Sequence, residues 1–207
     1  MVRNRFDRLD AARQERLFEA AADEFVDRGY EAASVNRILD EAGMSKGSLY
    51  YYFEDKADLF GTLLDRAVAK MLSVVGGLRV ESLTAETFWP TLDAYVERSE
   101  RYLSGSGWSA TLLRSFHRLH GGPKGRVLES LRRLTAEVLG RGQEIGVVRT
   151  DIPLSYLAEV TLALGETGDR WLLSHWEAIG GSERERLVGL QLEMLRRILR
   201  VESEAGV

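Results

Sequence analysis

Apolar residues recur at intervals of three and four along most of the chain, and stretches with strict alternation are absent. Such spacing is typical of amphipathic helices and not of strands. Three prolines and several glycine clusters divide the pattern into helix-length segments. The predicted helices cover residues 10–28, 35–42, 46–52, 56–75, 85–104, 108–119, 124–145, 153–177 and 183–203. The pattern therefore predicts an all-α protein of about nine helices.

Capping residues support several of these boundaries. Gly29 follows the first helix, where glycine commonly ends a helix. Ser34 precedes the second helix as a predicted N-cap. Asp55, with Asp58 three residues later, forms a predicted capping arrangement at the start of the helix over 56–75.

Two short helices, Val35–Ala42 and Lys46–Tyr52, are separated only by residues 43–45. Neither is long enough to be stable alone, so both must pack on longer neighbours. The spacing predicts a helix-turn-helix. Its expected inner face is Val35, Ile38, Leu39, Ala42, Leu49 and Phe53, and its expected support is Phe18, Ala21, Ala22 and Phe25 together with Phe60, Leu63, Leu64 and Ala67.

The outward surface of the second short helix suits DNA. It comprises Ser45, Lys46, Gly47, Ser48, Tyr50, Tyr51 and Tyr52. Small side chains let a helix approach base edges in the major groove, and hydroxyls can hydrogen-bond there. Lys46 and Lys56 can each neutralise a phosphate, and tyrosine offers both an apolar ring and a hydroxyl. Arg3, Arg5 and Arg8 are interpreted as a flexible basic arm before the first helix.

The run from Glu41 to Phe53, followed by Lys56 and Leu59-Phe60, resembles the DNA-binding signature of the TetR (tetracycline-repressor) family of bacterial transcriptional regulators. The resemblance implies a homodimer that binds a palindromic operator and is released by a small-molecule ligand. It implies a DNA-binding domain over 1–55 and a helical ligand-binding and dimerisation domain over 56–207. By position, the implied DNA-binding residues are Ser34, Arg37, Ser45, Lys46, Gly47, Ser48, Tyr50, Tyr51, Tyr52 and Lys56, with Ser45, Ser48 and Tyr50 near bases and Lys46, Tyr51, Tyr52 and Lys56 near phosphates.

The last two predicted helices carry more apolar surface than one domain needs. Residues 183–203 present two adjacent apolar stripes, one of which requires a partner. Small residues in 153–177 permit close helix contact. These helices predict a four-helix dimer interface containing Leu157, Leu164, Gly168, Leu172, Leu187, Leu190, Met194 and Ile198. The alternative is a monomer with an unusually buried final helix.

Aromatic and polar residues gather in the middle of the chain, where they suggest a small-molecule pocket between helices. The candidate lining is Trp89, Tyr95, Tyr102, Trp108, Arg114, Phe116, His117, Glu166 and Asp169. The alternative is that these aromatic residues simply fill the core. The residues alone do not identify the ligand.

Composition limits the other possibilities. The chain of 207 residues has no cysteine, which excludes thiol nucleophiles and cysteine-ligated metals. His117 and His120 lack an evident third ligand, so no metal or cofactor is expected. No nucleotide-binding, serine-hydrolase or zinc-protease motif occurs, and we expect no enzyme. The charged N-terminus and the lack of a long apolar run predict a cytoplasmic protein with no membrane segment.

Two other functions remain open at this stage. The chain could be a small-molecule-binding helical protein whose DNA-binding domain is not used, in which case substitutions at Lys46 or Tyr50 would not matter. It could also coat DNA without sequence preference. The second alternative conflicts with the charge, because residues 1–60 hold nine Lys/Arg and thirteen Asp/Glu and the whole chain has a formal net charge of −4.

Overall fold

The computed structural model describes residues 6–45, 47–116, 119, 121–175 and 178–201, and it describes residues 48 and 49 without their side chains. Every regular element among these residues is helical, as predicted. The chain divides into two compact units, Met1–Gly76 with Ser99–Val127, and Gly77–Arg98 with Leu128–Val207.

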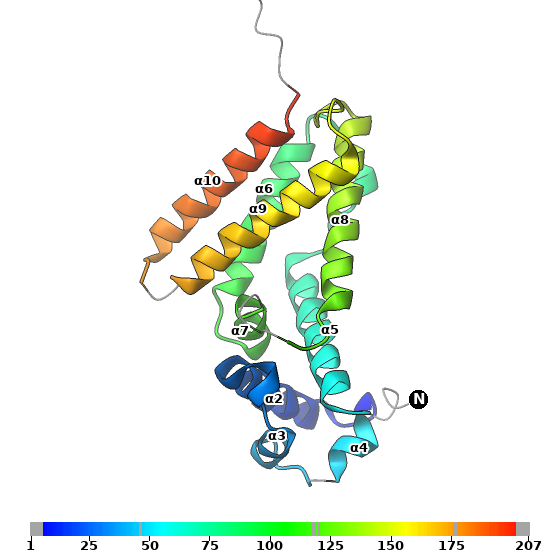
Figure 1. Cartoon of the computed structure of the whole chain (residues 1–207), viewed down its shortest axis with the longest axis vertical. Helices are drawn as coiled ribbons and strands as arrows, with labels where there is room; N and C mark the ends of the chain where they lie inside the picture. The colour runs from blue at the N-terminus through cyan, green and yellow to red at the C-terminus, as the bar shows by residue number, and fades with distance from the viewer. Residues whose placement is uncertain (1–5, 46, 117–118, 120, 176–177, 202–207) are drawn as a thin grey trace, which may run out of the picture. The chain divides into compact units, whose positions relative to one another are not determined.

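The first unit contains the helix-turn-helix (Figure 1). Its helices are α2 (Ala11–Ala32), α3 (Val35–Glu41), α4 (Ser48–Tyr52), α5 (Lys56–Val75) and α7 (Trp108–Arg114). Helix α2 packs on α3, α5 and α7, and α7 also packs on α5. The long helices thus provide the support that the short helices of the motif need.

The predicted caps of this unit are present. The Ser34 side chain accepts a hydrogen bond from the Arg37 N–H at the start of α3. Asp55 accepts one from the Asp58 N–H, and Asp58 in turn accepts one from the Glu54 N–H. Gly29 has φ +73°, so the chain leaves helical geometry there although the helical assignment continues to Ala32. These local signals confirm the predicted boundaries to within a few residues.

The core of the first unit matches the predicted stripes. Phe18, Ala21, Ala22 and Phe25 of α2, Ile38 and Leu39 of α3, and Phe60, Leu63, Leu64 and Ala67 of α5 are all buried. Phe53, directly after α4, is buried as well. Val35 is only partly buried.

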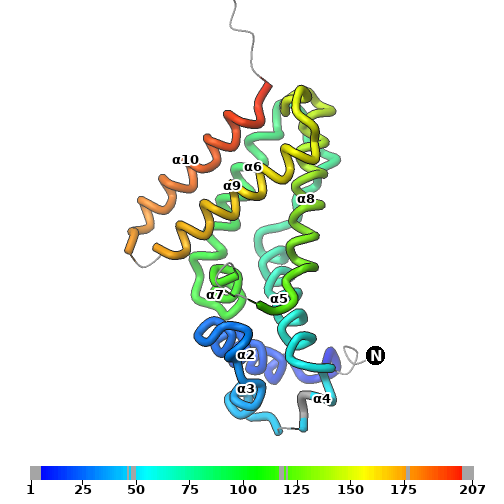
Figure 2. The backbone as a smooth tube through the Cα atoms, viewed as in Figure 1, coloured from blue at the N-terminus to red at the C-terminus, as the bar shows by residue number. Residues whose placement is uncertain are grey.

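The second unit contains a 3₁₀ turn, η1 (Val80–Ser82), and most of α6 (Phe88–Leu103), α8 (Gly125–Glu144), α9 (Leu154–Ser174) and α10 (Gly181–Leu199). Helices α9 and α10 run side by side and antiparallel (Figure 2). The predicted helix over 108–119 ends earlier, at Arg114, and the predicted helix over 183–203 ends at Leu199. The η1 turn was not predicted.

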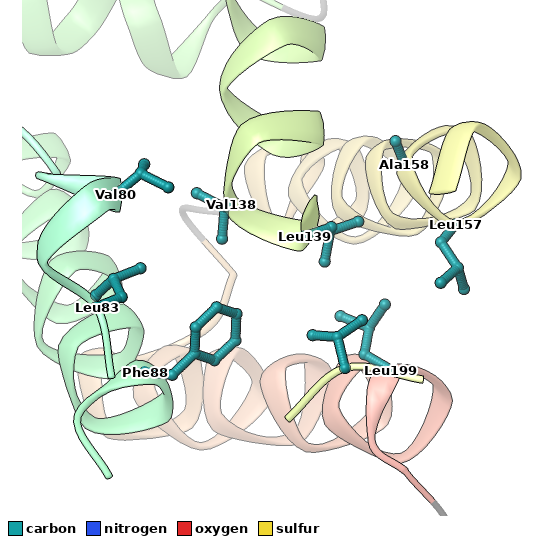
Figure 3. Packing of buried hydrophobic residues seen from close by; sticks show 9 residues of the cluster. Val80, Leu83, Phe88, Val138, Leu139, Leu157, Ala158 and Leu199 are labelled. Atoms are coloured by element: carbon teal, nitrogen blue, oxygen red, sulfur yellow. The ribbon is translucent and has the colours of Figure 1, made fainter. Parts of the chain in front are cut away.

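A second hydrophobic core holds this unit together (Figure 3). Phe88 of α6 is fully buried, and a Cβ atom added to Gly142 of α8 would lie 2.8 Å from the Phe88 ring. The glycine therefore allows α8 to approach the ring closely. The Arg149 N–H donates to the Leu199 carbonyl at 2.8 Å, which fixes the end of α10 to the loop before α9.

Candidate DNA-binding interface and ligand cavity

A glycine makes the turn of the helix-turn-helix possible. Gly43 has φ +66°, a region that side-chain-bearing residues rarely adopt. The Gly43 N–H donates to the Asp40 carbonyl at 3.1 Å, and the Met44 N–H donates to the Leu39 carbonyl at 2.8 Å. These hydrogen bonds end α3 in the manner of a glycine C-cap and redirect the chain toward α4.

Phe6 anchors the chain next to α4. Arg3, Arg5 and Arg8 were predicted to form a flexible basic arm before the first helix, and the described residues test this prediction only from Phe6 onward. Phe6 is buried, with its ring centroid 5.2 Å from that of Phe18 and 4.9 Å from that of Phe53. The Gln14 side-chain amide also donates to the Phe6 and Leu9 carbonyls. Burial of an aromatic ring outweighs the disorder that the surrounding arginines suggested; Arg3 and Arg5 lie outside the described residues.

The three tyrosines of α4 occupy different environments. The Tyr50 side chain is 76 % exposed and Tyr51 is 54 % exposed. Tyr52 is partly buried and contacts Phe6 edge-on, with a centroid separation of 5.9 Å. Ser45 and Gly47 are exposed beside them, while Lys46 and the side chain of Ser48 lie outside the described part of the chain. Tyr50 and Tyr51 thus present aromatic rings and hydroxyl groups to solvent at the expected recognition surface.

Glu24 connects the start of α3 to α2. Its carboxylate accepts the Ser34 N–H at 2.7 Å and two hydrogen bonds from Arg37, at 2.6 Å from Nη2 and 3.0 Å from Nε. The hydrogen bonds from Arg37, followed by that from Ser34, hold the pKa of Glu24 below its usual value, against the opposing effect of burial. Arg37 was predicted to bind DNA. Its guanidinium orients the motif and remains about half exposed.

We expect Glu24→Gln to destabilise the protein at neutral pH and much less in acid. A carboxylate whose pKa is lowered in the folded state contributes stability above the unfolded-state pKa, near the ordinary value of 4.5, and loses it as pH falls through the folded-state pKa. The urea midpoints of wild type and variant should therefore converge between about pH 5 and pH 3. Glu19→Gln, an exposed position on the same helix, serves as the control and should show no such convergence. A pH-independent difference for Glu24→Gln would contradict the assignment.

Lys56, which was predicted to contact a DNA phosphate, forms hydrogen bonds within the protein. Its ammonium donates to the carbonyls of Tyr30, Glu31 and Ala33, at 2.8, 3.1 and 3.3 Å. It also lies 4.7 Å from the centroid of the Tyr30 ring. A cation at the carbonyl end of α2 satisfies acceptors that the helix leaves unpaired. The lysine thus joins the start of α5 to the end of α2, and its contact with phosphate stays a prediction.

A groove beside the turn contains two arginines that the motif did not point to. It is lined by Arg13, Arg16, Gly43, Met44, Ser45 and Tyr52, among others, and has a volume of about 290 Å³. Arg13 forms a salt bridge with Asp10, whereas no salt bridge of Arg16 is found within the described part of the chain. Helical spacing from the apolar stripe of α2 could have indicated that both face the motif, but only the fold places them beside Ser45.

The second unit contains an apolar cavity of about 250 Å³ between α6, α8, α9 and α10. Two predicted ligand residues, Trp89 and Tyr95, line it. Burial raises the pKa of the Tyr95 hydroxyl. Arg196 and Asp93 form an ion pair at the same cavity.

The other predicted ligand residues lie elsewhere. In the first unit, the Tyr102 hydroxyl forms a hydrogen bond with the Ser109 hydroxyl at 2.6 Å, and the Trp108 indole N–H donates to Glu15 at 2.8 Å. Arg114 donates to the Gly105 carbonyl at 2.6 Å. Phe116 is buried, and the Lys124 ammonium lies over its ring. In the second unit, Glu166 pairs with Arg170, and Gln191 lies 3.5 Å from Asp169. None of these six lines the cavity, and His117 lies outside the described residues. The aromatic residues therefore divide between two cores, as the alternative interpretation allowed.

The residues of the predicted dimer interface differ in their exposure to solvent. Leu157 and Leu172 are buried within the unit, and Gly168 gives room for the Gln191 side chain. Leu187 and Ile198 are partly buried. Leu164, Leu190 and Met194 remain exposed, together with Trp171, which is not among the predicted interface residues. An exposed apolar face thus remains on α9 and α10.

Two features of the described residues bear on other functions. No group of three or more His, Cys, Asp or Glu side chains is arranged to hold a metal ion. No helix among these residues has the length and apolar character needed to cross a membrane.

These features define a class of protein, a helix-turn-helix transcriptional regulator with an additional helical part. Residues 17–63 match the family described as "Bacterial regulatory proteins, tetR family". The HTH-type transcriptional repressor AcnR of Corynebacterium diphtheriae is 32 % identical over 150 residues, which cover 70 % of this chain and 73 % of that protein. The AcnR protein of Corynebacterium glutamicum is 30 % identical over 159 residues, covering 73 % and 76 % respectively. The chain therefore belongs to the TetR family of bacterial regulatory proteins.

Solved structures agree on the fold. SmeT, the repressor of the Stenotrophomonas maltophilia multidrug efflux pump SmeDEF, superposes with a TM-score of 0.71 at 17 % identity, covering 91 % of each chain. A TetR-family regulator from Shewanella sp. PV-4 superposes with a TM-score of 0.70 at 14 % identity, covering 93 % of this chain and all of that one. Identities this low show the fold alone.

Proposed function

We propose that this protein is a homodimeric repressor that binds a palindromic operator and is released from it by a small molecule. The single observation that carries the DNA-binding assignment is the exposure of Tyr50 and Tyr51 on α4, directly after a Gly43 turn of fixed geometry. The repressor assignment is supported by the AcnR relatives, which are named as repressors. Residues 1–55 would then bind DNA and residues 56–207 would bind ligand and form the dimer.

The direction of α4 supports major-groove binding. Phe53 is buried against Phe6, and Tyr52 turns inward toward the same ring. The opposite side of the short helix is left for DNA, with Ser45 and Gly47 near its start. Small residues at the start of a recognition helix allow close approach to base edges, and tyrosines further along can meet thymine methyl groups and phosphates. Arg13 and Arg16 beside the turn would add positive charge for the phosphate backbone.

The exposed face of α9 and α10 supports the homodimer. Leu164, Leu190, Met194 and Trp171 are large apolar side chains that remain in water in the isolated chain. A second copy related by a two-fold axis would bury the same face of both chains. Two recognition helices related by that axis would contact two half-sites, which accounts for a palindromic operator.

The cavity in the second unit supports the proposal that the protein binds a small-molecule effector. Its apolar wall and few polar groups are those of a small-molecule site. An effector that binds more tightly to the form of the dimer that does not fit the operator would release DNA by shifting the population. Operator binding would then weaken effector binding by the same factor. This function needs no catalytic group and places the protein in the cytoplasm with the chromosome.

We expect Tyr50→Ala to weaken sequence preference strongly while leaving the fold intact. The experiment is selection of bound sequences from a random duplex pool with the wild-type protein and with the variant, followed by binding measurements on the enriched sequence. The wild type should enrich a palindrome, and the variant should bind it about 10- to 100-fold more weakly, because a good base contact contributes about 1–3 kcal/mol. Because Tyr50 is exposed, the thermal midpoint should not change.

Affinity for a random duplex provides the internal control for this experiment. It depends mainly on phosphate contacts and should fall steeply with salt in both proteins. Enrichment that survives Tyr50→Ala unchanged would refute the recognition-helix assignment. No enrichment by the wild type would favour the alternative in which the DNA-binding domain is not used.

A further inference from the structure

One polar side chain in the wall of the second-unit cavity bears on the chemistry of its ligand. The hydroxyl oxygen of Thr161, on α9, is buried and has no hydrogen-bond partner within the described part of the chain. Thr161 also lines the cavity, together with side chains of α6 and α8 such as Leu92 and Leu134. A buried hydroxyl without a partner is costly and rare in native proteins, so it calls for an explanation.

The rest of the wall is apolar. Leu92 and Val96 of α6, Leu134 and Leu139 of α8, and Leu192 and Leu195 of α10 contribute hydrocarbon surface. Val138, Leu139 and Leu199 belong at once to this wall and to the core shown in Figure 3. The cavity is therefore part of a folded core, and a ligand there replaces water against a preformed apolar surface.

The charges at the cavity balance one another. Arg196 forms its ion pair with Asp93, and its guanidinium lies 5.7 Å from the centroid of the Trp89 ring. Arg200, which does not line the cavity, lies 5.5 Å from the same ring. An anionic ligand would have to pair with Arg196, and a cationic ligand with Asp93. Either ligand would break the ion pair between these two residues. Desolvating a broken pair is expensive, so the wall favours an uncharged ligand.

The volume limits the size of the occupant. A cavity of about 250 Å³ exceeds the ~150 Å³ cavity that holds benzene and is smaller than the ~300 Å³ lower limit of typical drug-binding pockets. It is too small to accept a helix, whose diameter with side chains is about 10 Å.

Resting on the proposed function, we propose that the effector is an uncharged, mainly apolar molecule somewhat larger than benzene, which bears one hydroxyl or carbonyl group. The Thr161 hydroxyl turns about χ1 from its buried position to hydrogen-bond that polar group, and the hydrocarbon part contacts Leu92, Leu134 and Leu195. Trp89 and the Asp93–Arg196 pair line the same cavity, and the pair adds no net charge to its wall.

Three probes with one skeleton test this proposal: 3-phenylpropanol, propylbenzene and 3-phenylpropionate. Isothermal titration calorimetry of the full-length protein measures the affinity of each. We expect 3-phenylpropanol to bind about tenfold more tightly than propylbenzene, because it satisfies the Thr161 hydroxyl. We expect 3-phenylpropionate to bind more weakly than the alcohol, because the arginine that lines the cavity, Arg196, is already paired with Asp93.

Two matched variants locate the polar contact. Thr161→Val keeps the shape of the side chain and removes the hydroxyl, so it should lower the affinity for 3-phenylpropanol about tenfold and leave propylbenzene unchanged. Thr135→Val makes the same change at the other threonine of the wall and should leave the preference for the alcohol intact. Val96→Trp, which fills the cavity, should abolish binding of all three probes.

Several outcomes would overturn the proposal: tightest binding of 3-phenylpropionate, an alcohol preference that survives Thr161→Val, or no binding of any probe. Operator release is measured separately, by adding 3-phenylpropanol to the protein–operator complex. If the alcohol binds in a Thr161-dependent way but operator affinity is unchanged, the ligand class stands and the effector part of the proposed function fails. If the alcohol does not bind to a protein that binds operator, the ligand class fails while the DNA-binding function stands.

Discussion

Replacing Leu190 and Met194 together by glutamate is expected to give a monomer that binds the operator at least about 100-fold more weakly. The two side chains are 47 % and 57 % exposed on α10. In a two-fold interface each glutamate would face an apolar surface and its own copy, and burying unpaired like charges is strongly unfavourable. A monomer contacts only one half-site and loses the gain of about 10²–10⁴ that linked binding provides.

Light scattering coupled to size-exclusion chromatography measures the oligomeric state, and titration of a labelled operator measures affinity. Leu131→Glu is the matched control, because Leu131 is an apolar residue of α8 that is 45 % exposed and is not part of the predicted interface. The control should remain dimeric and bind the operator normally. A dimer that persists in the double variant would show that another surface joins the two copies. Since all three positions are exposed, the helical content should be unchanged.

Features that depend on neighbouring residues were predictable from the sequence. The caps at Ser34 and Asp55 and the turn at Gly43 each depend on residues within four positions. The apolar stripes of α2, α3 and α5 follow from helical periodicity, and the structure buries them as expected. These signals were sufficient for the helix-turn-helix and for its exposed tyrosines.

Features that depend on distant contacts were not predictable. Phe6 stands among arginines, so its local sequence suggests a mobile arm, and only the rings of Phe18 and Phe53 explain its burial. Trp108 donates a hydrogen bond to Glu15, 93 positions away, which places α7 with the DNA-binding motif. No periodicity encodes such a pairing.

The residues of the cavity were also only partly predictable from the sequence. Aromatic content pointed to Trp89 and Tyr95, which line the cavity, yet gave equal weight to Tyr102 and Phe116, which lie in the first unit. An aromatic side chain looks the same in a core and in a binding site. The sequence did not point to Thr161. What distinguishes this residue is that its buried hydroxyl has no hydrogen-bond partner among the described residues, and only the fold shows that.

The support of the motif converges on Phe60, and we expect Phe60→Ala to destabilise the protein by about 3–5 kcal/mol. The ring of Phe60 is fully buried, with its centroid 4.8 Å from that of Phe25 and 5.1 Å from that of Tyr30. A Cβ atom added to Gly122 would lie only 2.9 Å from the ring, so the loop before α8 packs directly on it. Truncation would leave a cavity between α2, α5 and this loop. The loss is a large share of the ~5–15 kcal/mol that stabilises a typical domain.

Urea unfolding followed by circular dichroism measures this loss, and Tyr50→Ala provides the comparison. Tyr50 is highly exposed, so its truncation should leave the free energy of unfolding nearly unchanged while weakening operator binding. Phe60→Ala should lower both, because Tyr30 contacts Phe60, and the Tyr30 carbonyl oxygen accepts a hydrogen bond from Lys56 at the start of α5. Phe60→Leu, which keeps much of the side-chain volume, should lose about half as much stability or less. A destabilisation below about 1 kcal/mol for Phe60→Ala would mean that the ring does not hold the motif to α2 and α5.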